Sequence, residues 1–564
     1  MGTLDWVVIG IFFLALIGII VWVVKQKQND SADYFLGGRD ATWLAIGASI
    51  FASNIGSEHL IGLAGAGASS GMAMAHWEIQ GWMILILGWV FVPFYSRSMV
   101  YTMPEFLERR YNPQSRTILS VISLISYVLT KVAVTVYAGG LVFQQVFGIK
   151  ELWGIDFFWI AAIGLVVLTA LYTIFGGMKS VLYTSVLQTP ILLLGSLIIL
   201  VLGFKELGGW DEMMSICSAV TVNEYGDTMT QLIRDNNDPN FPWLGALVGS
   251  AIIGFWYWCT DQFIVQRVLS GKNEKEARRG TIFGAYLKLL PVFLFLIPGM
   301  IAFALHQKYI GAGGEGFLPL LANGTANADA AFPTLVGKLL PAGVKGLVVC
   351  GILAALMSSL ASLFNSSAML FTIDFYKRFK PETPEKKLVG IGQIATVVIV
   401  ILGILWIPIM RSVGDVLYTY LQDVQSVLAP GIAAAFLLGI CWKRTSAKGG
   451  MWGLIAGMII GLTRLGAKVY YSNTAITDSS MFKYLFYDLN WLFFCGWMFL
   501  FCIIVVIAVS LMTEVPSAEK IQGLVFGTST PEQKAATRAS WNHWDIIHTV
   551  IILAITAAFY WYFW

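Results

Sequence analysis

Residues 51–72, FASNIGSEHLIGLAGAGASSGM, place hydrogen-bonding side chains inside an apolar stretch that is long enough to cross a membrane. Asn54, Glu58 and His59 lie among glycines at positions 56, 62, 65, 67 and 71, which weaken a helix. Small residues often serve close helix packing, which explains the later glycines well and the three polar side chains poorly. Irregular backbone at membrane depth survives only where it lines protein or a water-filled cavity. The stretch therefore predicts a helix interrupted near residues 53–57, beside a small-molecule site.

A second interruption is predicted in residues 254–267, GFWYWCTDQFIVQR, where Gly254 and Asp261 break an apolar span that is crowded with aromatic residues. The two interrupted spans are the second and the seventh along the chain, five apart. Two five-helix repeats of opposite topology, each beginning with a discontinuous helix, are typical of secondary transporters with a site near the membrane midplane.

Other polar side chains fall inside apolar spans: Glu78, Gln80, Lys131, Lys288, Gln422, Asp423 and Gln425. Placing an ionisable residue inside the membrane costs free energy, so such residues indicate function by default. Any single one is equally compatible with a structural role that holds helices together. Jointly, Glu78, Lys288 and Gln422 offer acceptors, a cationic donor and an amide, which suit a neutral polyol. The set contains no arginine, whose guanidinium group could bind a carboxylate substrate through two hydrogen bonds.

The segment 356–367, LMSSLASLFNSS, puts adjacent hydroxyls at Ser358 and Ser359 on a long apolar helix. A serine pair of this kind usually packs or bonds back to its own helix. Together with unwound carbonyls near residues 52 and 55, it predicts a five-oxygen cage for sodium, as in broken-helix transporters.

Composition places the chain in a bilayer, because only 12% of its 564 residues are charged and 57% are hydrophobic, whereas soluble proteins carry about 25% charged residues. The net charge of +3, with no basic stripe, argues against a nucleic-acid partner. The six cysteines contain no Cys-x-x-Cys pair and are expected to be buried small hydrophobes. No nucleophile–base set or metal-ligand spacing is present, so an enzyme is not expected.

We predict an all-α polytopic membrane protein with fourteen transmembrane helices, starting near residues 5, 42, 74, 117, 155, 181, 242, 280, 344, 388, 415, 449, 485 and 544. With this count, Lys and Arg concentrate in alternate loops, so the positive-inside rule places both termini outside a cell (plasma or inner) membrane. The expected domains are an extra helix at 1–24, a ten-helix transport core at 42–440, and three peripheral helices at 449–564 with an intracellular loop at 513–542.

Several long strings closely resemble the sodium/glucose cotransporter branch of the solute:sodium symporter family: GASIFASNIGSEHLIGLAGAGASSG, WYWCTDQFIVQR, YLKLLPVFLFLIPGM, LMSSLASLFNSSAMLFTIDFY and FLLGICWKRTSAKGGMWGL. The resemblance runs from about residue 33 to 450. It implies a LeuT-like core of 5+5 inverted repeats with discontinuous first and sixth core helices, and a monomer is expected to suffice for transport.

The resemblance also implies residue roles. It assigns sodium to the carbonyls of Ala52, Ile55 and Ala355 and the hydroxyls of Ser358 and Ser359. It assigns sugar binding to Asn54, His59, Glu78, Lys288 and Gln422, with Tyr257 and Trp258 as the stacking pair. Tyr257 is also the inner gate, and the outer gate is formed by Leu63, Trp77 and Tyr418.

Two departures from the family pattern matter. The motif Tyr-Thr-Asp, whose acid marks a second sodium site in two-ion members, reads Tyr183-Thr184-Ser185, which favours one sodium per sugar. Gly254 stands where some sugar transporters carry a polar side chain, so one sugar contact is expected to be absent. Asn323-Gly324-Thr325 fits a glycosylation sequon in an outside loop.

The sequence thus predicts a sodium-coupled symporter that imports a neutral hexose of the glucose or galactose type by alternating access. The nearest alternative keeps the fold and changes the cargo to inositol, an amino acid or an anion. A membrane sensor or channel without coupled transport is the alternative of another class.

Overall fold

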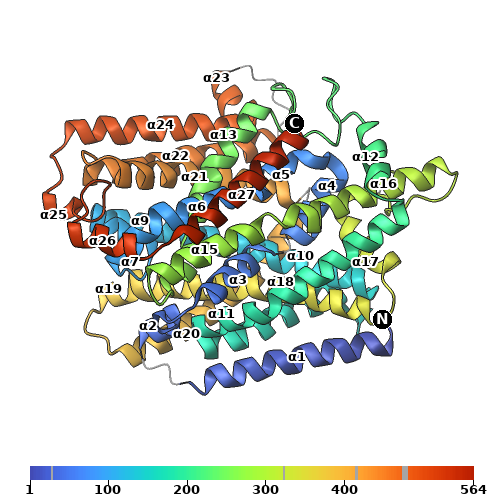
Figure 1. Ribbon diagram of the computed structural model, residues 1–564, viewed down its shortest axis with the longest axis horizontal. Helices are drawn as coiled ribbons and strands as arrows, with labels where there is room; N and C mark the ends of the chain where they lie inside the picture. Colours follow the sequence, from blue (N-terminus) through green and yellow to red (C-terminus); the bar gives the residue numbers. More distant parts are fainter. Residues whose placement is uncertain (27–29, 57, 322–323, 413–416, 473–479) are drawn as a thin grey trace.

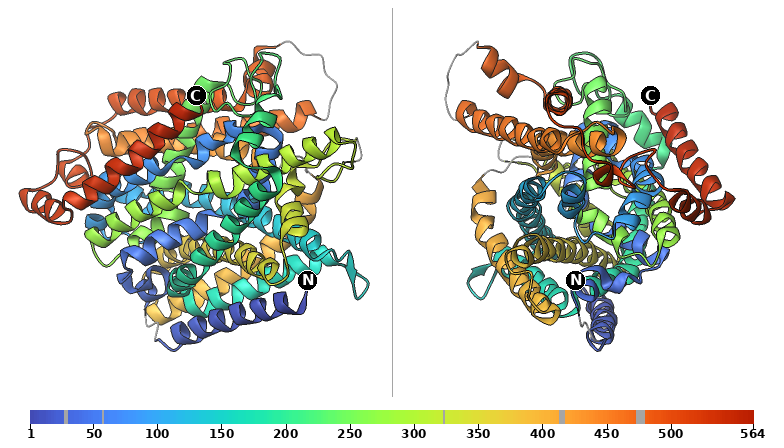
Figure 2. Two further views of the ribbon diagram at one scale, coloured as in Figure 1. Left: turned by 45° about the vertical axis from the view of Figure 1, so that its right-hand side comes forward. Right: turned by 90° about the vertical axis from the view of Figure 1, so that its left-hand side faces the viewer.

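The computed structural model describes residues 1–26, 30–56, 58–321, 324–412, 417–472 and 480–564, without the side chains of 129, 130, 145, 409–412, 417–421 and 472. Its long helices run roughly along one direction and form a bundle (Figure 1), several of them seen end-on in the right-hand view of Figure 2. These helices are α1 (Thr3–Val24), α3 (Trp43–Asn54), α9 (Pro113–Ser126), α10 (Ala133–Phe147), α11 (Phe157–Leu207), α13 (Trp243–Gly254), α15 (Glu274–Lys288), α16 (Ile297–Gly311), α18 (Val344–Met369), α20 (Glu385–Ser412), α21 (Leu417–Cys441), α22 (Ala447–Ser472), α24 (Trp491–Met512) and α27 (His543–Tyr562).

Shorter elements connect or extend these helices. The short α-helices are α2 (Ser31–Leu36), α4 (Ala64–Ser70), α5 (Ala75–Glu78), α6 (Gly81–Ile86), α7 (Val92–Ser98), α8 (Met103–Arg110), α12 (Trp210–Ser218), α14 (Gln262–Leu269), α17 (Ala331–Leu339), α19 (Lys377–Phe379), α23 (Met481–Lys483), α25 (Ala518–Ile521) and α26 (Pro531–Ala539). Wider, π-helical turns occupy Glu58–Leu63, Leu87–Phe91, Tyr127–Val132, Phe255–Thr260, Val292–Leu296, Leu370–Tyr376 and Tyr484–Asp488, and 3₁₀ turns occupy Gly37–Arg39, Gly71–Met74 and Ala328–Ala330. Strands β1 (Glu151–Leu152) and β2 (Ile155–Asp156) form a small antiparallel hairpin with Glu151 opposite Asp156.

Within the described residues, eleven helical stretches are long and apolar enough to cross a membrane. The chain is therefore a helical, multi-pass membrane protein, whereas the exact count of fourteen spans stays a prediction. Part of the difference lies in α11, which has 51 residues. At 1.5 Å per residue such a helix would be more than twice as long as the roughly 30 Å hydrocarbon core. Gly177 (φ 53°, ψ −148°) interrupts it, between the two spans that the sequence predicts there.

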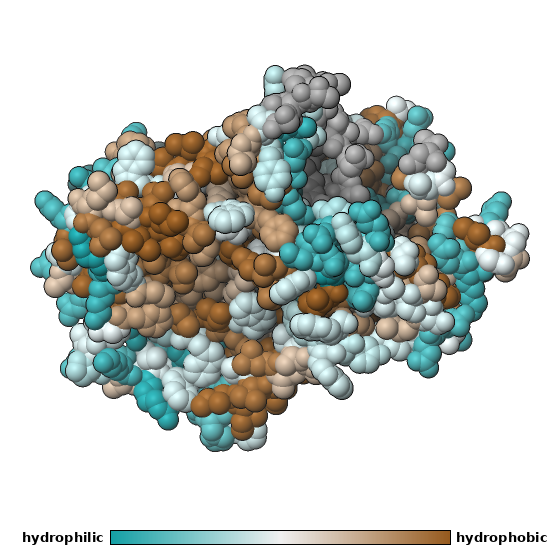
Figure 3. All heavy atoms as spheres, turned by 90° about the horizontal axis from the view of Figure 1, so that it is seen from above, coloured by the Kyte–Doolittle hydropathy of each residue, from teal (hydrophilic) through white to brown (hydrophobic). Residues whose placement is uncertain are grey.

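The surface matches this setting. In Figure 3, apolar side chains form a broad area over the left and middle of the view, and hydrophilic ones lie at the left edge and over much of the right side. Helix α1 illustrates the lipid-facing kind, because Leu4, Ile11 and Leu14 are all more than half exposed. Its one acid, Asp5, is buried instead and accepts hydrogen bonds from the backbone N–H groups of Gly343 (2.6 Å) and Gly346 (2.8 Å). The carboxylate thus satisfies orphan donors at the start of α18.

Two close helix contacts position the site. Helix α3 packs against α15 through glycines, since a Cβ on Gly280 would lie 2.6 Å from Ile46 and one on Gly47 would lie 2.5 Å from Phe283. Helix α11 packs against α18 at Gly351, where a Cβ would lie 3.3 Å from the Leu192 Cα. The first contact brings the broken end of α3 beside the end of α15, and the second places α11 beside the serines of α18.

Candidate transport site

The chain leaves helical geometry at both places where the sequence predicts an interruption. Helix α3 ends at Asn54, Ile55 is extended (φ −78°, ψ 106°), and helical turns resume at Glu58. In the other span, Asp261 is extended (φ −74°, ψ 128°) between the turn Phe255–Thr260 and α14. The last carbonyls of a helix have no partner within it, so the end of α3 supplies bare backbone oxygens inside the bundle.

A cavity lies beside these breaks and is lined by side chains from distant parts of the chain. All seven residues expected to bind sugar line it: Asn54, His59, Glu78, Tyr257, Trp258, Lys288 and Gln422. Ser359, one of the expected sodium ligands, and Trp77, one of the expected gate residues, line it as well. The tertiary structure therefore gathers into one place residues that lie up to several hundred positions apart.

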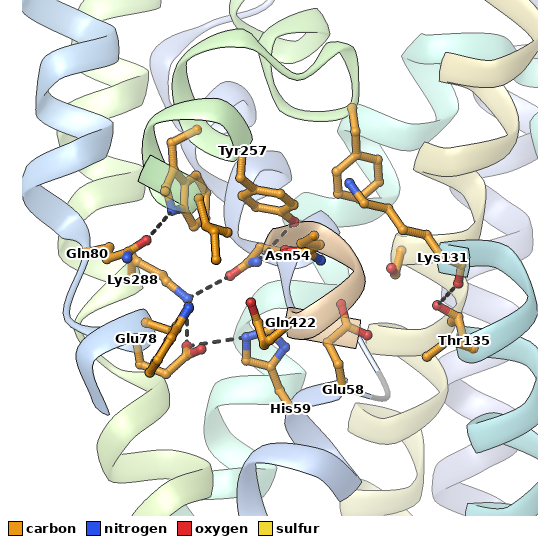
Figure 4. Close-up of a pocket in the computed structure, with 18 of the residues that line it drawn as sticks. Asn54, Glu58, His59, Glu78, Gln80, Lys131, Thr135, Tyr257, Lys288 and Gln422 are labelled. Carbon is orange, nitrogen blue, oxygen red and sulfur yellow. Dashed lines mark hydrogen bonds and ion pairs between the residues drawn. The ribbon is translucent and has the colours of Figure 1, made fainter. Parts of the chain in front are cut away.

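A chain of polar contacts crosses the cavity wall (Figure 4). The Lys288 ammonium donates to Glu78 Oε2 (2.6 Å) and to Asn54 Oδ1 (3.2 Å). His59 Nε2 lies 3.3 Å from the same Glu78 oxygen. The Asn54 amide in turn donates to the Tyr257 hydroxyl (3.1 Å). Helix α15, the α5 turn, the end of α3 and the second interrupted span are thus linked by one network of buried groups.

The structure explains why residue 254, in the lining of the cavity, is a glycine. A Cβ on Gly254 would lie 2.5 Å from Gln80 Oε1, so the missing side chain makes room for the Gln80 amide. That amide donates to the Ser250 carbonyl (2.8 Å) and accepts from the Trp258 indole N–H (3.3 Å). Gln80 therefore fills the space that a larger residue at 254 would occupy and fixes the Trp258 ring.

The residues expected to hold sodium are all buried, and they come from the end of α3 and the middle of α18. Ser358 Oγ lies 3.3 Å from Ser185 Oγ of α11, so the position that carries an acid in two-ion members of the resembled family faces this serine. The neighbouring Ser53 and Ser362 hydroxyls share a 2.6 Å hydrogen bond between the two helices. No cluster of three or more His, Cys, Asp or Glu side chains suited to a metal occurs among the residues described. Neutral oxygens of this kind suit a hard monovalent cation.

The expected outer gate is only partly described. Leu63 is buried, and the buried Trp77 ring stacks on Trp491 (centroids 5.5 Å apart) and meets Phe241 edge-on (6.1 Å). The side chain of Tyr418 lies outside the described residues. Trp491 begins α24, so this helix contacts the gate region, a role that the sequence does not predict.

Ten further lining residues are not among the predicted site residues: Glu58, Gln80, Lys131, Val134, Thr135, Ile253, Gly254, Phe263, Leu363 and Gln425. Lys131 forms a second buried ion pair, with Asp261 Oδ2 (2.7 Å), and the Tyr127 hydroxyl also bonds that carboxylate. The Lys131 ammonium lies 4.7 Å from the centre of the Tyr257 ring. The sequence signal was present, since Glu58 and Lys131 are ionisable groups within apolar stretches, but their common location required the fold.

A bundle of membrane-spanning helices with two interrupted spans and a polar cavity beside the breaks defines a carrier of small solutes. A family model described as the sodium:solute symporter family matches residues 34–457. The chain is 37% identical to sodium/myo-inositol cotransporter 2 of Homo sapiens over 538 residues (93% of this chain, 79% of the relative). It is also 37% identical to sodium/glucose cotransporter 1 of Ovis aries over 529 residues (90% and 79%).

The chain belongs to the sodium:solute symporter family. It is a sodium-coupled carrier and not an enzyme, and the family resemblance seen in its motifs is confirmed. Among solved structures, it resembles a substrate-bound, outward-open Na⁺-coupled sialic acid symporter with a TM-score of 0.74 and 22% identity, over 92% of this chain and 99% of the other. That likeness shows a shared fold.

Proposed function

We propose that this protein imports a neutral polyhydroxylated ring, of the hexose type, together with one sodium ion. The ten-helix core at 42–440 would work as two inverted repeats that alternate access to the cavity. The cell membrane is its proposed location, with both termini outside. Asp5 bonds the 343–346 turn, and the Leu232 N–H donates to the Phe563 carbonyl (2.9 Å). Each terminus therefore contacts a long loop that charge distribution assigns to the outside.

The charge balance of the cavity carries the choice of a neutral cargo. Its ionisable lining consists of two acids, Glu58 and Glu78, and two lysines, Lys131 and Lys288, with His59 beside Glu78. Both lysines are already paired with a carboxylate, Lys288 with Glu78 and Lys131 with Asp261, so an anionic solute would meet no unpaired lysine in the described lining. Its buried charge would then be left without a partner, which is costly. A neutral solute rich in hydroxyl groups would instead find hydrogen-bond acceptors and donors among the lining side chains. The Gln422 Oε1, which has no hydrogen-bond partner in the described protein, is one such acceptor.

The broken end of α3 supports the coupling. Sodium would hold α3 against α18, because it would be bound by the carbonyls of Ala52 and Ile55 on one side and by the hydroxyls of Ser358 and Ser359 on the other. Asn54 belongs to the same interrupted segment. Sodium binding that fixes this segment would therefore also fix Asn54, an expected sugar contact. Such coupling is reciprocal: sugar must raise the affinity for sodium by the factor by which sodium raises the affinity for sugar. Ser185 brings no second carboxylate, which supports a single ion.

A second candidate cargo is a cyclitol. Relatives at 37% identity include a sodium/myo-inositol cotransporter as well as a sodium/glucose cotransporter, and the same hydrogen-bonding wall suits either ring. The two candidates differ chemically in the ring oxygen and anomeric carbon, which only the hexose has.

The test is uptake into proteoliposomes with an inward sodium gradient. Radiolabelled galactose and myo-inositol should each be compared with and without sodium, and with unlabelled glucose, galactose, myo-inositol and proline as competitors. Gln422→Ala should abolish sodium-dependent uptake. Gln393→Ala is the matched control, because Gln393 lies on α20 outside the cavity lining and its amide donates to the Ile174 carbonyl of α11 (3.1 Å). Competition by proline alone, or uptake indifferent to sodium, would refute the proposal.

A further inference from the structure

The cavity contains two carboxylates in different electrostatic situations. The Glu78 carboxylate is engaged by the Lys288 ammonium (2.6 Å) and lies 3.3 Å from His59 Nε2. The Glu58 carboxylate lines the same cavity and, among the described residues, has no ion pair and no hydrogen bond to another residue. Figure 4 draws Glu58 between His59 and Lys131, pointing toward the space beneath Asn54 and Gln422.

Gly56 is what permits this placement. A Cβ at Gly56 would lie 2.4 Å from Glu58 Oε2 and 3.0 Å from its Cδ. The carboxylate therefore folds back over the unwound backbone, and a side chain at position 56 would displace it. Gly56 lies within the interruption itself, directly after the extended Ile55.

A carboxylate inside a membrane-embedded cavity needs donors, because taking an unpaired charge out of water is expensive. Lys288 donates to Glu78 and His59 lies beside it, whereas the donor that the described residues give to Glu58 is its own backbone N–H. A carboxylate offers two acceptor oxygens side by side, which match two adjacent hydroxyls on a ring. The hydroxyl groups of the transported solute would then be the hydrogen-bond donors to the Glu58 carboxylate.

We propose that Glu58 is a substrate-recognition residue that accepts hydrogen bonds from two neighbouring hydroxyls of the transported ring. This rests on the proposed transport of a polyhydroxylated solute. It also places a substrate contact three residues after Ile55, whose carbonyl is an expected sodium ligand, so a single break in the chain would carry both ligands.

The experiment measures uptake by wild type, Glu58→Gln and Gly56→Ala in proteoliposomes, with radiolabelled galactose and myo-inositol at saturating sodium. For whichever ring wild type transports, the set of its monodeoxy analogues is then used as competitors. Glu58→Gln should raise the KM at least tenfold and leave the half-saturating sodium concentration within about twofold. The wild-type loss of affinity for two adjacent deoxy positions should disappear in this variant and persist at the other positions.

Gly56→Ala keeps the carboxylate and displaces it, so it should reproduce the KM rise and the same lost deoxy penalties. Gln393→Ala should match wild type in every measurement. If Glu58→Gln keeps the wild-type KM and deoxy pattern, or raises only the sodium requirement, Glu58 is no substrate contact and the inference is wrong. Absence of any polyol uptake by the wild type would instead refute the proposed function, and this inference with it.

Discussion

The Lys288–Glu78 pair allows a quantitative prediction about transport. Both side chains are buried, with exposed fractions of 3% and 1% for the two residues, and their charged atoms are 2.6 Å apart. Replacing Glu78 by glutamine keeps the shape and removes the negative charge. Breaking a buried pair by removing one partner costs about 3–5 kcal/mol, because the other charge is left uncompensated.

We expect the lower end of that range for Glu78→Gln, because the glutamine oxygen still accepts a hydrogen bond and Lys288 keeps its 3.2 Å contact with Asn54. That loss should appear as a lower melting temperature of the purified protein. Uptake should fall as well, because a hydrogen bond to a charged group contributes about 1.5–3 kcal/mol; losing one at Glu78 lowers kcat/KM roughly 10- to 150-fold, since about 1.4 kcal/mol is tenfold. The assay is initial sodium-driven uptake in proteoliposomes, with thermal melting of the purified protein measured in parallel.

The double variant Glu78→Gln/Lys288→Met separates stability from recognition. Removing both charges should recover most of the melting temperature lost by Glu78→Gln, since no buried charge is left alone, while uptake stays low. Coupling energies of contacting residues reach about 0.5–3 kcal/mol. Uptake by Glu78→Gln within threefold of wild type, or melting losses that simply add in the double variant, would refute the buried-pair explanation.

Three further outcomes are expected. Ser359→Ala should raise the half-saturating sodium concentration several-fold more than Ser362→Ala does; an unchanged sodium dependence would place the ion elsewhere. The ratio of charge to substrate flux should be near one because Ser185 provides no second carboxylate, and a ratio near two would contradict this. Burial raises the pKa of the Asp329 carboxyl, in the 306–343 connection, to about 6, and its Oδ1 lies against Gly65 with no hydrogen-bond partner among the described residues. Wild-type stability should therefore fall as pH rises from about 4 to 6, and Asp329→Asn should raise the melting temperature at pH 7.5 but little at pH 4; an equal effect at both would contradict the shift.

Much of the architecture was readable from local patterns. A membrane helix satisfies its backbone within the segment, so runs of apolar residues predict helices without any knowledge of their neighbours. For the same reason, glycine, serine and asparagine at Ser53–Gly56, and the aspartate at 261, predict where the helices break, and the described backbone breaks at both. The count of fourteen spans stays a prediction, since eleven stretches of the described residues qualify as spans; one of these, the 51-residue α11, covers two predicted spans on either side of Gly177.

The contents of the cavity depended on tertiary structure. Asn54 and Lys288 lie 234 positions apart, and their meeting depends on the glycine contacts between α3 and α15, which no local pattern encodes. Adjacent helical residues point about 100° apart, so a small rotation of a helix would turn Glu58, Gln80 or Lys131 from the cavity into packed protein. The sequence by itself determined that polar groups and unwound backbone occur within the membrane. Only the packing of distant helices decided which of those groups face one another, which charges are paired, and which carboxylate, Glu58, has no ion pair among the described residues.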